Sequence, residues 1–257
     1  MGEVHHFTYG WVTPVFAYGL SFLGSMLGLV CTARARVATD NRKRAGLLVL
    51  AAWAIGGTGI WVMHFMAMIG FSVSGSEVRY DVPLTVLSFV IAVVMVGVGL
   101  FIVGMGKPNA LKVLSGGLVA GLSVAAMHYI GMAAMEIDGK IGYDRNLVLG
   151  SVAIAVVAAT VALWFTLVIR GLGATILAAA VMGVAVCGMH YTGMAAMRLE
   201  SSTGFTALHG VSVNWFLAPM VLFVLVVFFA MMNLTMAVPT AEEERGYASR
   251  QMGNSPA

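Results

Sequence analysis

The chain has 257 residues, of which 60% are hydrophobic and only 10% carry a charge. A water-soluble domain of this length needs far more charged surface, so the composition excludes a soluble globular protein. The formal net charge of +3 requires no nucleic-acid partner, because attraction to anionic lipid headgroups accounts for a modest basic excess.

Seven uncharged apolar runs are long enough to cross a bilayer, which takes roughly 20 helical residues. In chain order they are residues 11–33, 45–71, 82–105, 113–135, 147–169, 172–197 and 211–238. The sequence therefore predicts an all-α, polytopic membrane protein with seven transmembrane helices. Residues 1–10 contain no Lys or Arg, so we expect an outer N-terminal segment and no cleaved signal peptide. Residues 239–257 are polar and are expected to form a short, disordered tail.

Lys and Arg are distributed unequally between the two sides of the predicted helices. Ten fall on one side and four on the other, and the first loop, "ARARVATDNRKR", holds five of the ten. Short loops that are rich in Lys and Arg stay in the cytoplasm. We therefore expect a multi-pass protein of the inner (plasma) membrane, with the N-terminus outside and the C-terminus in the cytoplasm.

One short motif occurs three times, near the ends of the second, fourth and sixth runs. The three copies read "GIWVMHFMAMIGF", "SVAAMHYIGMAAM" and "AVCGMHYTGMAAM", with motif cores at residues 63–68, 127–135 and 189–197. Each core carries one histidine, and these are His64, His128 and His190. A motif on every second helix predicts three repeated two-helix hairpins plus one extra helix in a membrane domain of residues 11–238.

Helical spacing places methionines on the same face as the histidines, because positions i+4 and i+7 return to nearly the face of position i. These methionines are Met68, Met132 and Met194 at i+4, and Met135 and Met197 at i+7. Imidazole binds several transition metals, and thioether sulfur adds a preference for Cu(I). These residue types favour a copper ion bound by the three histidines, with the methionines as supporting ligands. Haem and zinc are the alternative cofactors. The second nitrogen of each ring is expected to have a hydrogen-bond partner.

The motif also has a structural interpretation, since a membrane histidine often bonds a neighbouring helix and methionine fills irregular cores. Three copies at matching depth favour ligands over packing. His5, His6 and Cys187 are further candidate ligands whose role the sequence leaves open. The chain contains no P-loop, dinucleotide fingerprint or paired carboxylates, so we assign no catalytic residue.

The tripled motif, as "MHFMAM", "MHYIGMAAM" and "MHYTGMAAM", resembles the MHYT-domain family of bacterial integral membrane sensors, over about residues 10–236. The resemblance implies copper bound through the motif His and Met residues. It also implies sensing of a diatomic gas (oxygen, carbon monoxide or nitric oxide) or of redox state. A copper-handling or copper-delivery protein is the alternative function, and a membrane metalloenzyme is the third.

Two features depart from the family pattern. The first repeat has Phe65 where the others have Tyr129 and Tyr191, and Phe71 replaces the second methionine. Many family members also continue into a cyclic-dinucleotide or kinase output domain. The expectation here is a stand-alone member that signals through a separate cytoplasmic output protein.

Overall fold

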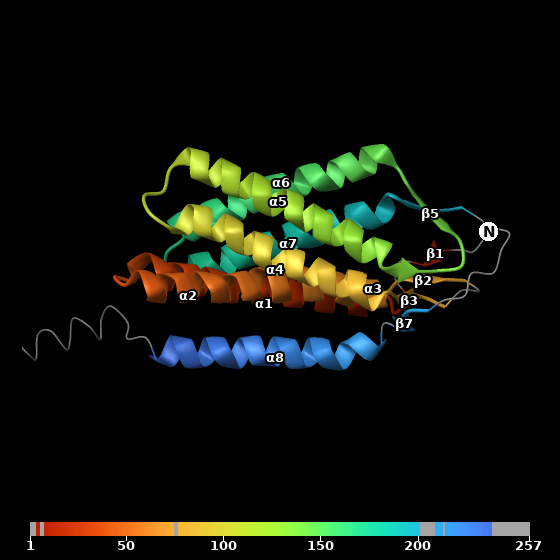
Figure 1. The fold of residues 1–257 in the computed structure, drawn as a ribbon, viewed down its shortest axis with the longest axis horizontal. Helices are drawn as coiled ribbons and strands as arrows, with labels where there is room; N and C mark the ends of the chain where they lie inside the picture. Colours follow the sequence, from red (N-terminus) through yellow and green to blue (C-terminus); the bar gives the residue numbers. More distant parts are fainter. Residues whose placement is uncertain (1–3, 6–7, 75–76, 201–208, 213, 238–257) are drawn as a thin grey trace, which may run out of the picture.

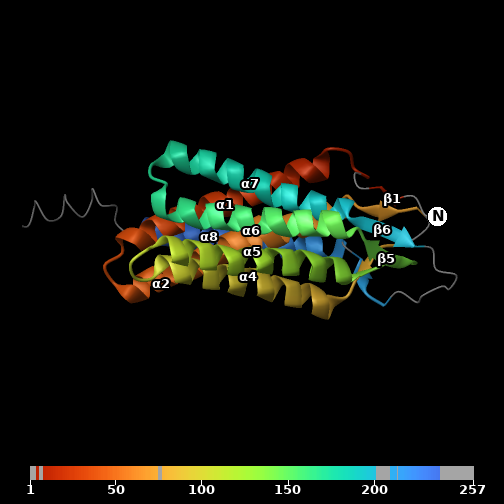
Figure 2. The same cartoon turned by 90° about the horizontal axis from the view of Figure 1, so that it is seen from above.

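The computed structural model describes residues 4–5, 8–74, 77–200, 209–212 and 214–237. Within these ranges the chain forms seven helical rods that run along one long axis (Figures 1 and 2). Six of the rods are long and apolar enough to span a membrane, and the seventh contains a shorter apolar stretch at Ala218–Ala230. The all-α, polytopic membrane architecture is therefore confirmed. The predicted tail of residues 239–257 and His6 lie outside the described residues.

Six rods consist of a single α-helix each. They are α1 (Val12–Val37), α4 (Val82–Gly104), α5 (Ala110–Ala133), α6 (Arg145–Val168), α7 (Leu172–Ala195) and α8 (Asn214–Ala237). The second rod is composite, and its parts are α2 (Asn41–Ala52), the π-helical segment η1 (Trp53–Val62) and α3 (Met63–Ile69).

The first six rods pack into a closed ring. The composite rod packs against α1 and α4, α5 lies between α4 and α6, and α7 closes the ring by contacting α6 and α1. Helix α8 lies to one side of this ring (Figure 1) and contacts η1 and α1. Side chains exposed on the outside of the rods are largely apolar, as expected for surfaces that face lipid.

The two ends of the ring differ in structure. The basic end consists of the tight α1–α2, α4–α5 and α6–α7 connections, where cationic side chains donate hydrogen bonds to the last carbonyls of helices. Arg36 donates to the Ile169 oxygen at 2.6 Å, Arg44 to the Ala38 oxygen at 2.8 Å, and Lys112 to the Met105 oxygen at 2.7 Å.

Short strands form the strand end, at the other end of the ring (Figure 1). They are β1 (Val4–His5), β2 (Ser72–Val73), β3 (Arg79–Tyr80), β4 (Met135–Glu136), β5 (Lys140–Tyr143), β6 (Met197–Glu200) and β7 (Val211–Ser212). They pair antiparallel as β1–β2, β4–β3–β7 and β5–β6. Pairing joins the ends of different repeats, because β3 bonds to both β4 and β7.

The π-helical segment η1 was not foreseen, since the run 45–71 was expected to be regular α-helix. It contains the sequence "GGTG", and glycines there allow close backbone packing. A Cβ added at Gly24 of α1 would lie 2.5 Å from the Ala54 oxygen and 2.6 Å from the Gly59 Cα. A π-helical turn widens the helix and often accompanies a functional site. Here it comes directly before the motif of α3.

Replacing Gly24 by alanine is expected to destabilise the fold by about 1–3 kcal/mol, because the new methyl group overlaps backbone atoms that cannot move aside. Gly19 on the same helix has nothing within 4 Å of an added Cβ, so Gly19→Ala is the matched control. Thermal unfolding in detergent measures both variants. Equal midpoints for the two would contradict this close packing.

Candidate metal centre

The three motif histidines meet inside the ring at its strand end. Nδ1 of His64 lies 3.0 Å from Nδ1 of His190 and 3.2 Å from Nδ1 of His128. Candidate ligand atoms of all three lie within 4.8 Å of one another. The side chains are 0%, 1% and 2% exposed for His64, His128 and His190. We call these residues the histidine triad, and the convergence predicted from the repeat is confirmed.

Equivalent positions on alternate rods bring the triad together. His64 lies on α3, His128 on α5 and His190 on α7, each near the strand end of its rod. The three ring centroids are 5.0, 5.0 and 5.2 Å apart, and each pair of rings is nearly perpendicular. The triad therefore joins one helix from each of the three hairpins.

Glycines of the motif make room for two of the rings. A Cβ at Gly131 would lie 2.5 Å from His64 Nε2, and a Cβ at Gly193 would overlap His128 Nε2. Each of these rings thus lies against the glycine three residues after the histidine of the next repeat. The glycine in the motif "MHYxGM" is therefore part of the site, because any other residue would displace a ring.

The prediction that the second nitrogen of each imidazole has a hydrogen-bond partner is wrong for two of the histidines. Within the described residues, Nε2 of His64 and Nε2 of His128 have no hydrogen-bond partner. The physical reason is the packing described above. With each Nε2 against a glycine, the Nδ1 atoms point toward the centre of the triad.

The predicted methionines form one apolar layer between the triad and the strands. All five belong to one cluster of buried apolar side chains, and they are Met68, Met132, Met194, Met135 and Met197. Their exposed fractions run from 0% to 9%. Fully buried Tyr80 and Phe65 complete the layer. It closes the triad from the strand end, while binding of a metal by these sulfurs stays a prediction.

The Phe and Tyr variation between repeats has a local cause. The Tyr129 hydroxyl on α5 forms a 2.6 Å hydrogen bond with the Ser151 hydroxyl on α6. Phe65 is instead surrounded by aromatic rings, with Trp61 at 4.9 Å and Tyr80 at 5.6 Å between centroids. The Tyr129 hydroxyl is thus placed where the neighbouring rod offers a polar partner, and Phe65 where it meets other aromatic rings.

Acidic residues at the strand end hold its connections together, a role the sequence analysis missed. Glu136 accepts hydrogen bonds from the backbone N–H groups of His209 and Gly210 at 2.7 and 3.0 Å. These two bonds lower the pKa of the Glu136 carboxyl. Asp144 caps α6 and pairs with Arg198 at 2.6 Å. An Asp directly before a helix often caps that helix, and this signal could have revealed the capping role of Asp144 from the sequence.

The other candidate ligands are not part of the described triad. Cys187 is a free thiol on α7, one turn before His190, and Cys31 is a free, buried thiol on α1. The backbone of His5 pairs with Ser72 in the β1–β2 ribbon. Within the described residues, the triad is the only group of three such side chains placed to share an ion.

Comparison with known proteins also gives three repeats, one for each copy of the motif, but each begins shortly before the motif and includes the helix that follows it. A family model described as MHYT, the bacterial signalling protein N-terminal repeat, matches residues 57–117, 121–180 and 183–243. No solved structure matches the chain.

Three curated relatives come from two bacteria. The bifunctional diguanylate cyclase/cyclic di-GMP phosphodiesterase MucR of Pseudomonas aeruginosa is 36% identical over 215 residues, 81% of this chain and 31% of the relative. The cyclic di-GMP phosphodiesterase NbdA of the same organism is 36% identical over 58% of this chain and 20% of its own length. The signalling protein YkoW of Bacillus subtilis is 34% identical over 56% of this chain and 19% of its own length. This chain spans less than a third of the length of each relative. The family model and the relatives together show that the chain belongs to the MHYT family of bacterial signalling proteins.

Proposed function

We propose that this membrane protein binds one copper ion through the histidine triad and senses a diatomic gas there, or the redox state. The observation that carries the proposal is the convergence of three buried Nδ1 atoms, with separations of 3.0 and 3.2 Å from His64 to its two partners. Three nitrogens that bind one ion tetrahedrally at about 2 Å lie roughly 3.3 Å apart. The spacing of the triad therefore fits a single ion.

The donor set favours copper over the alternatives. All three ligands are neutral imidazoles in a site with almost no exposure, and burying an ion without an anionic partner costs less for a monovalent than for a divalent cation. The layer of thioethers beside the triad adds a preference for Cu(I). Haem fits poorly, because ring centroids 5.0–5.2 Å apart leave no room for a porphyrin between the rings.

Copper(I) in such a site would supply an open coordination position for a diatomic ligand. The protein's own residues orient the imidazoles and exclude water. Gly131 and Gly193 let the rings turn their Nδ1 atoms inward, and the buried layer of Met68 and Met132 keeps bulk water away. The triad also couples the three hairpins, since each histidine belongs to a different one.

That coupling suggests how a signal reaches the other end of the ring. A change in the geometry of the triad shifts α3, α5 and α7 relative to one another, and packed helices transmit such shifts as rigid rods. The connections at the basic end would then move, and a cytoplasmic output domain or protein would read the change. A copper-delivery protein would need further ligands along a path. Within the described residues the structure provides no second group of three His, Cys, Asp or Glu side chains placed to share an ion.

The proposal includes an orientation that puts the triad near the outer face. A reporter inserted between β4 and β5 is expected to be external, and one placed after residue 257 is expected to be cytoplasmic, because Lys and Arg concentrate at the basic end. Paired phosphatase and fluorescent-protein fusions measure both positions. Swapped signals would place the triad on the cytoplasmic side.

The test of the proposed function uses carbon monoxide as the probe. Protein loaded with copper and reduced is expected to show a C–O stretching band in the infrared after exposure to the gas. Metal-free protein and the double variant His128→Ala/His190→Ala are expected to show none. A band of equal strength from either control, or no band from the loaded protein, would overturn the proposal.

A further inference from the structure

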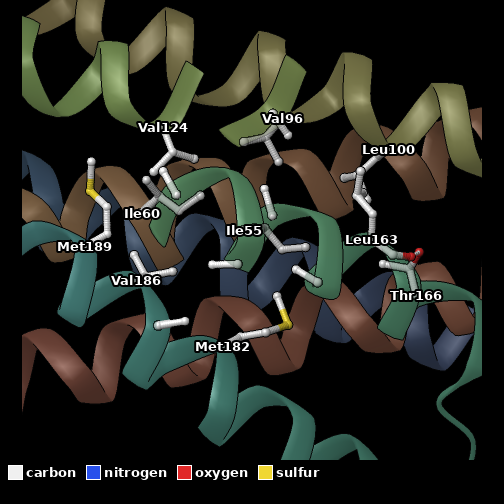
Figure 3. A pocket seen from close by; sticks show the side chains of 16 residues that line it. Ile55, Ile60, Val96, Leu100, Val124, Leu163, Thr166, Met182, Val186 and Met189 are labelled. Carbon is white, nitrogen blue, oxygen red and sulfur yellow. Dashed lines mark hydrogen bonds between the residues drawn. The ribbon is translucent and has the colours of Figure 1, made fainter. Parts of the chain in front are cut away.

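A cavity of about 60 Å³ lies in the middle of the six-rod ring. Its walls come from η1, α4, α5, α6 and α7, and their side chains are apolar apart from Thr166. The Thr166 hydroxyl already donates to the Leu163 oxygen at 2.6 Å. Figure 3 shows Thr166 and Leu163 at one end of the cavity and Met189 at the other.

The Met189 end of the cavity is next to the histidine triad. Ile60, Val124 and Val186 line the cavity and group near Met189 in Figure 3. Each lies four residues before a histidine of the triad, which corresponds to one helical turn, or about 6 Å. Met189 directly precedes His190. The three repeats thus place three equivalent apolar side chains between the cavity and the three imidazoles.

The size and lining of the cavity select its occupant. A void needs about 10–15 Å³ to admit a water molecule, and water also needs polar partners, so an apolar void stays dry. A volume of about 60 Å³ admits a diatomic molecule or a xenon atom. An apolar chain or ring of drug size needs at least about 300 Å³.

The triad is covered at the strand end, whereas the cavity beside it is less well covered on the side of α6 and α7. Tyr80, Met68 and Met132, which cover the strand side, are at most 1% exposed. The lining residues that are only partly buried, Ala158, Ala159 and Ala185 among them, all belong to α6 and α7. Apolar gases concentrate in hydrocarbon, so the bilayer is the richer source for such a cavity.

We propose that this cavity is a binding site for a small apolar gas molecule, which enters from the bilayer between α6 and α7 and passes from there to the triad. The ligand class is an uncharged diatomic such as oxygen, nitric oxide or carbon monoxide. Passage to the triad rests on the proposed function. Occupation of the cavity does not, because it depends only on shape and lining.

The test uses xenon as a probe on metal-free protein, by xenon-129 NMR or by anomalous scattering from xenon-pressurised crystals. Two variants fill the cavity from different walls, Ala159→Phe on α6 and Ala185→Leu on α7. The matched control is Ala153→Phe, because Ala153 is an exposed alanine of α6 that does not line the cavity. Copper content is measured on every variant after loading.

Wild type and Ala153→Phe are expected to bind xenon, whereas the cavity-filling variants lose it and still retain copper. In the copper-loaded protein, the carbon monoxide band should form more slowly in both filled variants than in the control. Absence of xenon from wild type, or equal xenon binding by all variants, would overturn the cavity site. A wild-type protein that binds xenon but gives no carbon monoxide band would overturn the proposed function and leave the cavity site standing.

Discussion

Replacing His64 by alanine is expected to abolish copper binding. Nδ1 of His64 is within 3.2 Å of the same atom of both partners, so its loss removes the nitrogen that connects the other two. Changes outside the ligand shell typically weaken metal affinity by about 10–100-fold, and loss of a ligand should exceed about 100-fold. Metal analysis after loading and desalting gives the copper content per chain.

The matched control for this variant is His209→Ala. His209 is exposed, and it is the backbone N–H of this residue that bonds Glu136, so the substitution leaves both the triad and that bond in place. Copper content should equal that of the wild type, and both variants should retain the helical circular-dichroism spectrum. Full copper stoichiometry in a folded His64→Ala protein would mean that the histidines pack the core and do not bind the metal.

Replacing Gly193 by alanine is expected to weaken copper binding by about 10–100-fold, although no ligand is removed. An added Cβ would lie 2.8 Å from Cδ2 of His128 and closer still to Nε2, so the ring must rotate and its Nδ1 leaves the centre of the triad. Overpacking of this kind also costs about 1–3 kcal/mol of stability. Competition with a calibrated Cu(I) chelator measures the affinity.

Gly188 provides the control on the same helix. A Cβ added at Gly188 meets nothing within 4 Å, so Gly188→Ala tests the effect of alanine on α7 without touching His128. Its affinity for copper should match that of the wild type. If both alanine variants bind copper as tightly as the wild type, the rings are not held by the glycines in the way described.

Much of the fold could be predicted because the bilayer constrains it strongly. The lengths of the apolar runs alone predicted the helical rods. For example, the run 172–197 agrees within two residues with α7 at Leu172–Ala195. The repeat then gave the site. Copies of one motif on equivalent helices must lie at one depth, so convergence of His64, His128 and His190 followed from their spacing.

Other features could not be predicted because they depend on packing between segments far apart in the sequence. Nothing local shows that β3 pairs with both β4 and β7, or that "GGTG" lies within a π-helical segment facing Gly24. The direction of two of the imidazoles depends on a glycine of another repeat, as His64 against Gly131 shows. The central cavity likewise requires five helical segments to be placed together.

Binding of one copper ion by the three histidines of the triad is tested most directly by X-ray absorption at the copper edge of loaded, reduced protein. We expect one copper per chain with about three nitrogen neighbours at roughly 2 Å, and imidazole multiple scattering in the extended spectrum. The His64→Ala protein should give no such shell. A spectrum of the wild type that contains only sulfur or only oxygen neighbours, without imidazole scattering, would contradict the claim.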